Sequence, residues 1–123
     1  MTHILLAEDD PAIAMSLKVT CKREGWQITW LDNASSVLPM LHSAEAQDLS
    51  AIILDVGLPD GDGLSLCQQI RHTSDIDGLK GIPIIFLTAR SDEVDIILGL
   101  GMVGDDYCAK PFSPRELVAR LKA

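Results

Sequence analysis

The sequence lacks several features, and each absence excludes a class of protein. None of its apolar runs approaches the roughly 18 residues that would cross a membrane, and its N-terminus has no basic region or apolar core of a signal peptide. Its three cysteines, Cys21, Cys67 and Cys108, are odd in number, widely spaced and set among apolar neighbours. This pattern favours buried thiols in a reducing compartment over disulfides or a metal site. We therefore expect a cytoplasmic protein that does not enter a membrane.

Positive charge and internal repetition are also scarce. Lysine and arginine total 10 against 18 aspartates and glutamates, and the net charge of -8 argues against nucleic-acid binding by this chain itself. The sequence has no internal repeat, low-complexity stretch or interdomain linker. Its 123 residues are enough to bury one hydrophobic core. We therefore expect residues 1–123 to form one domain.

Short apolar runs predict the strands of a parallel sheet. Residues 4–7, 51–54 and 82–87 form continuous apolar runs, as is typical of strands that are buried on both faces. Residues 27–31 and 106–109 are weaker candidates. Each of these segments is followed by a helical pattern.

The helical patterns complete an alternating α/β arrangement. Asp10 is expected to N-cap a helix that begins at Pro11, in which Ile13, Leu17 and Cys21 recur at helical spacing. The other expected helices span residues 35–42, 64–71, 92–100 and 114–121. Five strands alternating with five helices predict a three-layer α/β/α sandwich, a flavodoxin-like (βα)5 fold with parallel sheet order 2-1-3-4-5.

Polar side chains stand at the expected carboxyl ends of four strands, where open α/β sheets bind ligands. The acidic residues 8–10 follow the first strand and Asp55 follows the third. Thr88 follows the fourth strand and Lys110 follows the fifth. The first and third strands flank the point where the strand order reverses, so their carboxylates are expected to converge in one crevice.

This convergence predicts a magnesium site that receives a phosphoryl group. Glu8, Asp9 and Asp55 would repel one another unless a cation lay between them. Mg2+ accepts one or two carboxylates, several waters and phosphate oxygens, whereas Ca2+ requires more protein oxygens than this cluster offers. The charge of Lys110 and the hydroxyl of Thr88 suit an anion with several oxygens, such as a phosphoryl group carried by a carboxylate.

Each of these features also has a simpler structural explanation. Residues 8–10 can serve as helix N-terminal charges, and Thr88 can cap the helix that follows it. Asp55 can be a turn residue, and Lys110-Pro111 can belong to an ordinary loop. Taken singly, each simpler explanation is the better one, but their coincidence at one edge of one sheet favours a functional site.

Four segments carry a resemblance to a known family over essentially the whole chain. The runs ILLAEDD, AIILDVGLPDGDGL, IPIIFLTAR and DDYCAKPFSPRELVARL resemble the receiver domain of bacterial response regulators. The resemblance implies that Asp55 accepts a phosphoryl group from a phosphohistidine of a sensor histidine kinase. It also implies that Asp9 binds Mg2+ directly and Glu8 binds it through water, with Asp55 and the backbone carbonyl of Gly57 completing the protein ligands.

The same resemblance assigns the residues of a switch. Thr88 would hydrogen-bond a phosphoryl oxygen and Lys110 would pair with the phosphoryl group. Tyr107 would then turn inward as Thr88 moves, and Pro111 would hold the Lys110 peptide in the cis form. Phosphorylation would in this way change the surface formed by the last two helices.

Three positions depart from the pattern of the family. Ile96 stands where many relatives carry a basic residue that forms ion pairs across a dimer, and Val103-Gly104 replaces the usual Gly-Ala. Gly57 offers no side chain two residues after Asp55. Since a side chain there can influence an attacking water, the sequence leaves the lifetime of the phosphorylated form open.

The C-terminal run KPFSPRELVARLKA resembles the OmpR/PhoB subclass. Its final helix reaches Lys122-Ala123 without a Gly, Asn or Pro to end it. We therefore expect an N-terminal receiver whose DNA-binding output domain is absent from this chain, with phosphorylation promoting a homodimer through the last two helices. The candidate ion-pair residues are Asp105, Asp106, Arg115, Glu116 and Arg120. A stand-alone receiver of the chemotaxis type is the alternative.

Three other functions fit the sequence less well. A phosphohydrolase of the haloacid dehalogenase type would need a second aspartate at the position of Gly57, together with a cap domain or a longer chain. A flavin-binding module would need a phosphate-cradling loop in place of the acidic residues 8–10. A degenerate receiver that serves only for docking is disfavoured because no expected site residue is missing.

Overall fold

A central parallel sheet organises the chain. The computed structural model describes residues 2–43, 48–72, 82–88, 106–110 and 113–122, and the account that follows concerns these residues. The sheet has the order β2-β1-β3-β6-β7. Its strands are β1 (His3–Ala7), β2 (Gln27–Leu31), β3 (Ala51–Asp55), β6 (Ile84–Thr88) and β7 (Asp106–Ala109). This confirms the predicted order 2-1-3-4-5, because β6 and β7 are the fourth and fifth strands of the sheet in chain order.

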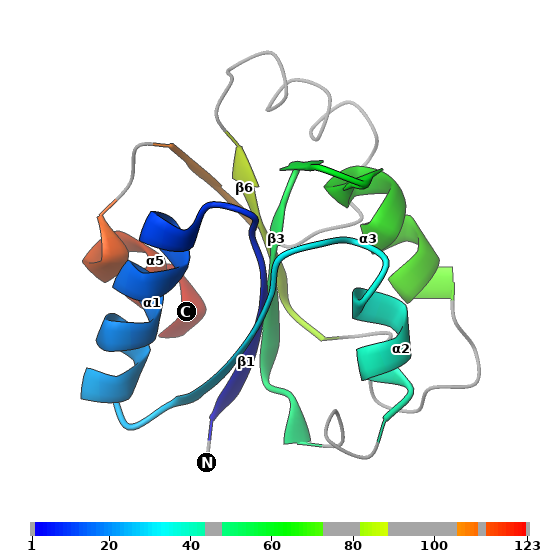
Figure 1. The fold of residues 1–123 in the computed structure, drawn as a ribbon. Helices are drawn as coiled ribbons and strands as arrows, with labels where there is room; N and C mark the ends of the chain where they lie inside the picture. The colour runs from blue at the N-terminus through cyan, green and yellow to red at the C-terminus, as the bar shows by residue number, and fades with distance from the viewer. Residues whose placement is uncertain (1, 44–47, 73–81, 89–105, 111–112, 123) are drawn as a thin grey trace.

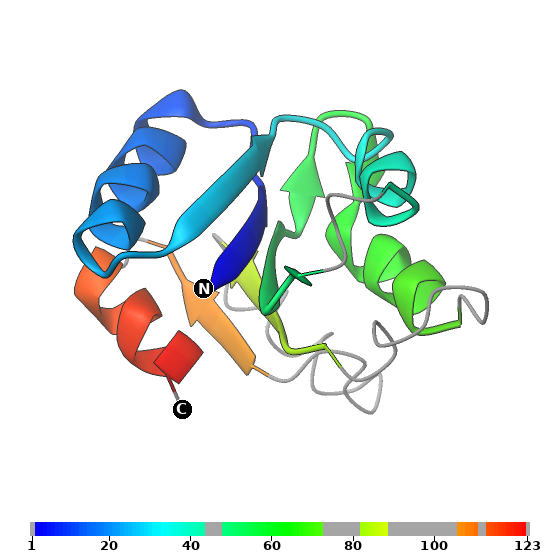
Figure 2. The same cartoon turned by 90° about the horizontal axis from the view of Figure 1, so that it is seen from below.

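Helices cover both faces of this sheet. α1 (Pro11–Arg23) and α5 (Pro114–Lys122) lie together on one face, and α2 (Val37–Leu41) and α3 (Gly63–His72) lie on the other (Figure 1). The view from below in Figure 2 separates the same two helical layers across the sheet. The predicted three-layer sandwich is therefore confirmed for the described residues, whereas the helix expected at 92–100 lies outside them.

The continuous apolar runs of the central strands divide between two cores. Successive side chains of a strand point to opposite faces, so Ile4 and Leu6 join the core beneath α1 and α5. Leu5 and Ala7 join the core beneath α2 and α3. Every residue of β1, β3 and β6 is buried, as a parallel sheet covered on both faces requires.

Local sequence signals set both ends of α1. The Asp10 carboxylate accepts a hydrogen bond from the backbone N–H of Ala12 at 2.9 Å, and Pro11 occupies the first helical position. Gly25 follows the helix with a φ of 76°, a conformation that glycine adopts without steric cost. The buried residues of α1 are Ala14, Leu17 and Cys21.

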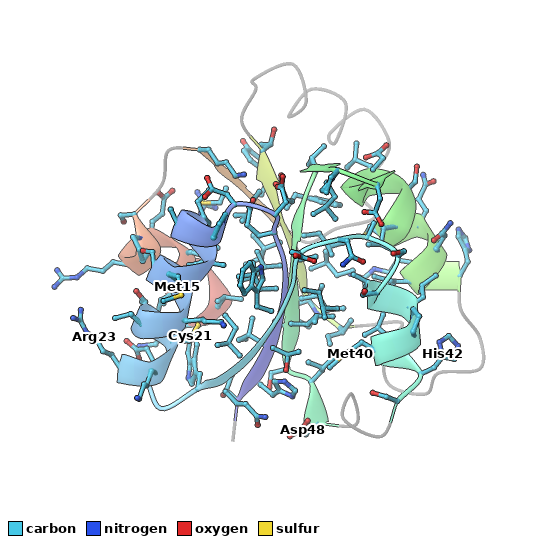
Figure 3. The ribbon with its side chains drawn as sticks, viewed as in Figure 1. Met15, Cys21, Arg23, Met40, His42 and Asp48 are labelled. Atoms are coloured by element: carbon cyan, nitrogen blue, oxygen red, sulfur yellow. The ribbon has the colours of Figure 1, made fainter. Side chains whose placement is uncertain are left out.

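Side-chain burial agrees with the composition of the chain. Cys21, Cys67 and Cys108 are all buried free thiols, which confirms the prediction made from their neighbours. Met40 of α2 turns toward the sheet, and His42, which directly follows this helix, turns away from it (Figure 3). Within the described part of the chain, no helix is both long enough and apolar enough to cross a membrane.

Some element bounds differ from those predicted. The fourth strand is displaced to Ile84–Thr88, so that Thr88 ends the strand instead of following it. α2 is shorter than predicted. Pro39 lies in its first turn, where backbone N–H groups have no partner within the helix, so the lack of an N–H in proline costs no helical hydrogen bond. A hairpin of β4 (Gly57–Leu58) and β5 (Gly61–Asp62) follows β3 and was not predicted.

Candidate functional site

The predicted polar residues meet at the carboxyl edge of the sheet. Asp55 is the last residue of β3 and Thr88 is the last residue of β6, while Glu8 and Lys110 directly follow β1 and β7. The parallel register brings these ends side by side, because Ala7 pairs with Leu54 and the other strands continue the same ladder. The tertiary structure thus assembles residues that are more than a hundred positions apart in the chain.

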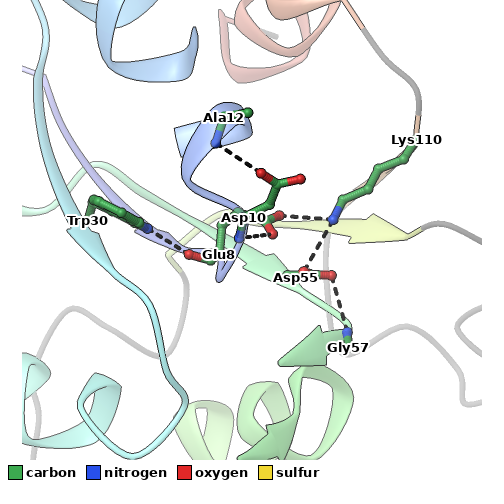
Figure 4. A network of polar contacts seen from close by, with 7 residues as sticks. All are labelled: Glu8, Asp10, Ala12, Trp30, Asp55, Gly57 and Lys110. Atoms are coloured by element: carbon green, nitrogen blue, oxygen red, sulfur yellow. Dashed lines mark hydrogen bonds and ion pairs between the residues drawn. The ribbon is translucent and has the colours of Figure 1, made fainter. Parts of the chain in front are cut away.

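Lys110 lies between two buried carboxylates (Figure 4). Its Nζ is 3.0 Å from Oε2 of Glu8 and 3.2 Å from Oδ2 of Asp55. Its backbone N–H donates to the carbonyl of Thr88 at 2.7 Å, which anchors the start of the Lys110 side chain to the end of β6. Glu8 is 0% exposed and Asp55 is 6% exposed, so their mutual repulsion is only weakly screened by water. The ammonium group of Lys110 offsets that repulsion.

Burial dominates the ionisation of Glu8. Desolvation raises the pKa of its carboxyl from 4.5 to about 7, although hydrogen bonds from the backbone N–H of Asp10 and from Lys110 oppose this shift. The N–H of Asp10 donates to Oε1 of Glu8 at 3.0 Å. For Lys110, burial alone would lower the pKa, but the adjacent carboxylates of Glu8 and Asp55 outweigh it and raise the pKa above its ordinary value. Lys110 is therefore fully charged at neutral pH.

The raised pKa of Glu8 predicts a pH-dependent stability in the absence of divalent cations. Because the folded pKa exceeds the unfolded value, the contribution of Glu8 is fully present below about pH 4.5 and is lost as the pH rises through about 7. Glu8→Gln cannot titrate. Relative to wild type, the variant should therefore gain up to about 3 kcal/mol between pH 4.5 and pH 8. Urea unfolding with a chelator present at several pH values measures this difference.

The control for this comparison is Glu116→Gln, which removes an exposed glutamate on α5. Its stability relative to wild type should change little with pH over the same range. A difference between Glu8→Gln and wild type that stays constant from pH 4.5 to pH 8 would show that Glu8 ionises normally in the folded protein.

Three carboxylates at this edge are close enough to hold one cation. One oxygen from each of Glu8, Asp9 and Asp55 lies within 4.8 Å of the others, with Asp9 exposed and the other two buried. Oε2 of Glu8 is buried, and Nζ of Lys110, 3.0 Å away, is the cation that faces it. A hard divalent cation that binds carboxylates and keeps several waters fits this set of donors, because the exposed side at Asp9 leaves room for water.

The backbone around Asp55 lies too close to the first residue of α3 for a side chain at that position. The N–H of Gly57 donates to Oδ1 of Asp55 at 3.2 Å, and the N–H of Gly63 donates to the carbonyl of Val56 at 3.0 Å. A Cβ on Gly63 would overlap the carbonyl oxygen of Asp55 and approach Cα of Val56 to 3.0 Å. A Cβ on Gly57 would meet no atom within 4 Å. A glycine at position 63 is therefore needed for α3 to pack against the backbone of Asp55. Sequence reasoning missed this requirement because only the fold brings α3 onto Asp55.

A hydrogen bond from Trp30 to Glu8 is a second contact that sequence reasoning missed. Its indole Nε1–H donates to the backbone carbonyl of Glu8 at 2.6 Å (Figure 4). The backbone N–H of Glu8 donates to the carbonyl of Leu31 at 3.0 Å. The end of β2 therefore holds both main-chain polar groups of Glu8, and no spacing in the sequence indicates this contact.

The remaining predicted residues are placed as follows. Thr88 is 0% exposed, and Tyr107 is half-buried on β7, in register with Phe86 and packed against the core beneath α2 and α3. Glu116 pairs with Arg120 of the same helix at 3.4 Å, an exposed pair that contributes little to stability. The predictions for Ile96, Val103-Gly104, Asp105 and Pro111 fall outside the described residues.

Comparison with known proteins agrees with the fold. Residues 4–122 match the family described as the response regulator receiver domain. Over 97% of its length the chain is 43% identical to the transcriptional regulatory protein CreB of Escherichia coli. Over 98% of its length it is 47% identical to the transcriptional regulatory protein GltR of Pseudomonas aeruginosa. The chain spans about half the length of these curated relatives, 48% and 47% respectively.

Solved structures give the same result. A two-component response regulator from Clostridium difficile superposes with a TM-score of 0.82 at 29% identity, covering 99% of this chain and 93% of that one. A response regulator from Chloroflexus aurantiacus superposes with a TM-score of 0.80 at 32% identity, covering 98% and 93%. The match across nearly the whole sequence, together with the flavodoxin-like sheet and its acidic edge, places this chain in the response regulator receiver domain family.

Proposed function

We propose that this chain is the phosphoacceptor domain of a two-component regulator and that Asp55 is the residue phosphorylated. One observation carries the proposal: a buried aspartate at the end of β3 shares a lysine with a second buried carboxylate at the carboxyl edge of the sheet. A purely structural aspartate gains nothing from such surroundings, since burying charges costs more than their pairing returns in most proteins. An aspartate that must receive an anion does gain from them.

In the proposed reaction a carboxylate oxygen of Asp55 attacks phosphorus in line with the donor atom. The bond from phosphorus to that donor breaks, and the donor leaves with the bonding electrons, so that an acyl phosphate forms on Asp55. Lys110 is 3.2 Å from Asp55 and would follow the new negative charge onto the phosphoryl oxygens. Thr88 would donate its hydroxyl to one of these oxygens from the end of β6.

The proposal assigns the acidic cluster to Mg2+. Asp9 would bind it directly and Glu8 through water, while Asp55 and the backbone carbonyl of Gly57 would supply the other protein oxygens. When bound, Mg2+ neutralises charge on the phosphoryl group in transfer. The protein contributes the fixed positions of these oxygens, which the main-chain bonds of Glu8 and Gly57 maintain.

Phosphorylation would act as a switch and not as turnover of a separate substrate. The new group carries about -1.5 to -2 charges and three acceptor oxygens, enough to draw Thr88 toward it. Tyr107, half-buried beside Phe86, would then fill the vacated space and change the surface next to β7. This surface, with the last two helices, would form a phosphorylation-dependent homodimer.

The partners follow from the same proposal. The donor would be a phosphohistidine of a sensor histidine kinase, and this chain would receive the phosphoryl group in the cytoplasm. An output domain outside this chain would control transcription by binding DNA; the relatives CreB and GltR, about twice the length of this chain, are named as transcriptional regulatory proteins. The receiver itself, with a net charge of -8, would not contact nucleic acid.

Labelling by a small phosphoryl donor tests the function directly. Incubation with acetyl phosphate should add one phosphoryl group per chain when Mg2+ is present and almost none when a chelator removes it. Asp55→Asn should abolish the labelling, because an amide oxygen does not form the acyl phosphate. Intact-mass measurement counts the groups.

Asp32→Asn is the matched control, since Asp32 is an exposed aspartate just beyond β2. This variant should be labelled like wild type. Labelling that survives Asp55→Asn would overturn the assignment of the phosphoacceptor. Steady release of phosphate from many small phosphate esters would instead favour a phosphohydrolase.

A further inference from the structure

The β1–α1 turn is held from the edge of the sheet by a side chain outside the acidic cluster. Nε1–H of Trp30 donates to the carbonyl oxygen of Glu8 at 2.6 Å, and the N–H of Glu8 donates to the carbonyl of Leu31 at 3.0 Å. The carbonyl of Glu8 belongs to the peptide that joins Glu8 to Asp9. The hydrogen bond from Trp30 therefore fixes the orientation of this peptide, and with it the direction in which the chain enters Asp9.

The indole ring is itself restrained by two further elements. It packs against the core cluster beneath α1 and α5. Nζ of Lys18, from α1, lies 4.9 Å from the centroid of the ring, within range of a cation–π contact. Trp30 therefore connects β2, the β1–α1 turn and α1, and its N–H cannot turn away from Glu8 without disturbing both contacts.

The chemistry of the indole suits a position beside an acidic cluster. Its N–H is a donor without any acceptor capacity, so it can satisfy the Glu8 carbonyl and cannot itself compete for a cation. A glutamine, serine or histidine at this position would bring a lone pair close to the carboxylates. Asp9 is exposed, and its placement relative to Glu8 and Asp55 depends on the backbone that precedes it.

We infer that Trp30 is a positioning residue for the divalent-cation site, acting through the Glu8 carbonyl to hold Asp9 in place. The inference rests on the proposed function, because it assigns the cluster of Glu8, Asp9 and Asp55 to a bound Mg2+. Trp30 does not touch the phosphoryl group or the cation. It acts on the site only through the backbone.

Trp30→Phe tests this role, because it keeps an aromatic ring and removes the N–H. Calorimetric titration of the variant with Mg2+ should give an affinity about fivefold weaker than wild type, the effect of one hydrogen bond of about 1 kcal/mol. In acetyl phosphate labelling, the Mg2+ concentration for half-maximal rate should rise by a similar factor. The rate at saturating Mg2+ should stay close to that of wild type.

Trp26→Phe is the matched control, since Trp26 packs against the same core cluster but precedes β2 instead of lying near its end. It should lower the melting temperature without changing the Mg2+ affinity. If Trp30→Phe also loses stability but binds Mg2+ like wild type, Trp30 is only a packing residue and the inference is overturned.

A second measurement remains available if Trp30→Phe does not fold. In Trp26→Phe, Trp30 is the single remaining tryptophan, and its emission should change as Mg2+ saturates the site. Emission that stays constant while calorimetry records binding would also overturn the inference. A different result would contradict the proposed function: wild-type protein that binds Mg2+ but is not phosphorylated by acetyl phosphate.

Discussion

Replacing Lys110 with methionine is expected to destabilise the metal-free protein by roughly 3 kcal/mol at pH 8, as for a broken buried ion pair. Methionine retains most of the length of the side chain but leaves Glu8 and Asp55 without the cation that lies 3.0 and 3.2 Å from them. The loss should be smaller at pH 5, because the pKa of Glu8 is about 7 and its carboxyl is then already neutral. Urea unfolding with a chelator at both pH values measures the effect.

Added Mg2+ should recover part of the stability lost in Lys110→Met at pH 8, since it replaces one cation by another at the same carboxylates. Phosphorylation of the variant should nevertheless stay slow, because Lys110 would no longer balance the charge on the phosphoryl group. Lys122→Met is the control: its partner Glu24 lies at 3.0 Å, but Lys122 is 55% exposed. It should cost less than about 1 kcal/mol. Equal losses in the two variants would contradict a special role for Lys110.

Gly63→Ala is expected to cost about 2 kcal/mol or more, and to slow phosphorylation as well. The added methyl group would overlap the carbonyl oxygen of Asp55 and press on Cα of Val56. Both contacts are backbone atoms, which cannot move aside as a flexible side chain would. The better helix propensity of alanine offsets at most about 1 kcal/mol of this strain. Urea unfolding and acetyl phosphate labelling measure the two effects.

Gly57→Ala is the control for the same chemical change near the same aspartate. Nothing lies within 4 Å of a Cβ at this position, so the fold should tolerate the methyl group. Its stability should remain within about 0.5 kcal/mol of wild type, as for most surface substitutions. A stable Gly63→Ala protein with normal labelling would mean that α3 can move away from Asp55 at little cost.

The sequence by itself determined the sheet and the edge at which the site lies. The apolar runs at 4–7 and 51–54 predict strands buried on both faces, because a strand with one solvated face would alternate with polar residues. Alternation with helical patterns then determines a parallel sheet, and a parallel sheet places all carboxyl ends at one edge. Glu8, Asp55 and Lys110 were assigned to that edge from their positions alone, and the structure places them there.

The sequence predicted short elements and the exact ends of strands less well than it predicted the sheet. The hairpin of β4 and β5 has only two residues in each strand, too few for a hydrophobic period to be visible in the sequence. The apolar run at 82–87 begins two residues before the fourth strand does. Ile82 belongs to this run and is buried, but it precedes the residues that form the strand. Bounds of this kind depend on pairing with β3 and β7, which the local sequence does not encode.

Only the tertiary structure decided which atoms meet at the site. The sharing of Lys110 by Glu8 and Asp55 depends on the register of four strands. The hydrogen bond from Trp30 to Glu8 joins residues 22 positions apart, and it requires the edge strand to end beside the β1–α1 turn. The need for glycine at position 63 arises from the packing of α3 against Asp55. Residue types and spacing specify strands, but distances of 3 Å between distant segments arise only when the segments pack.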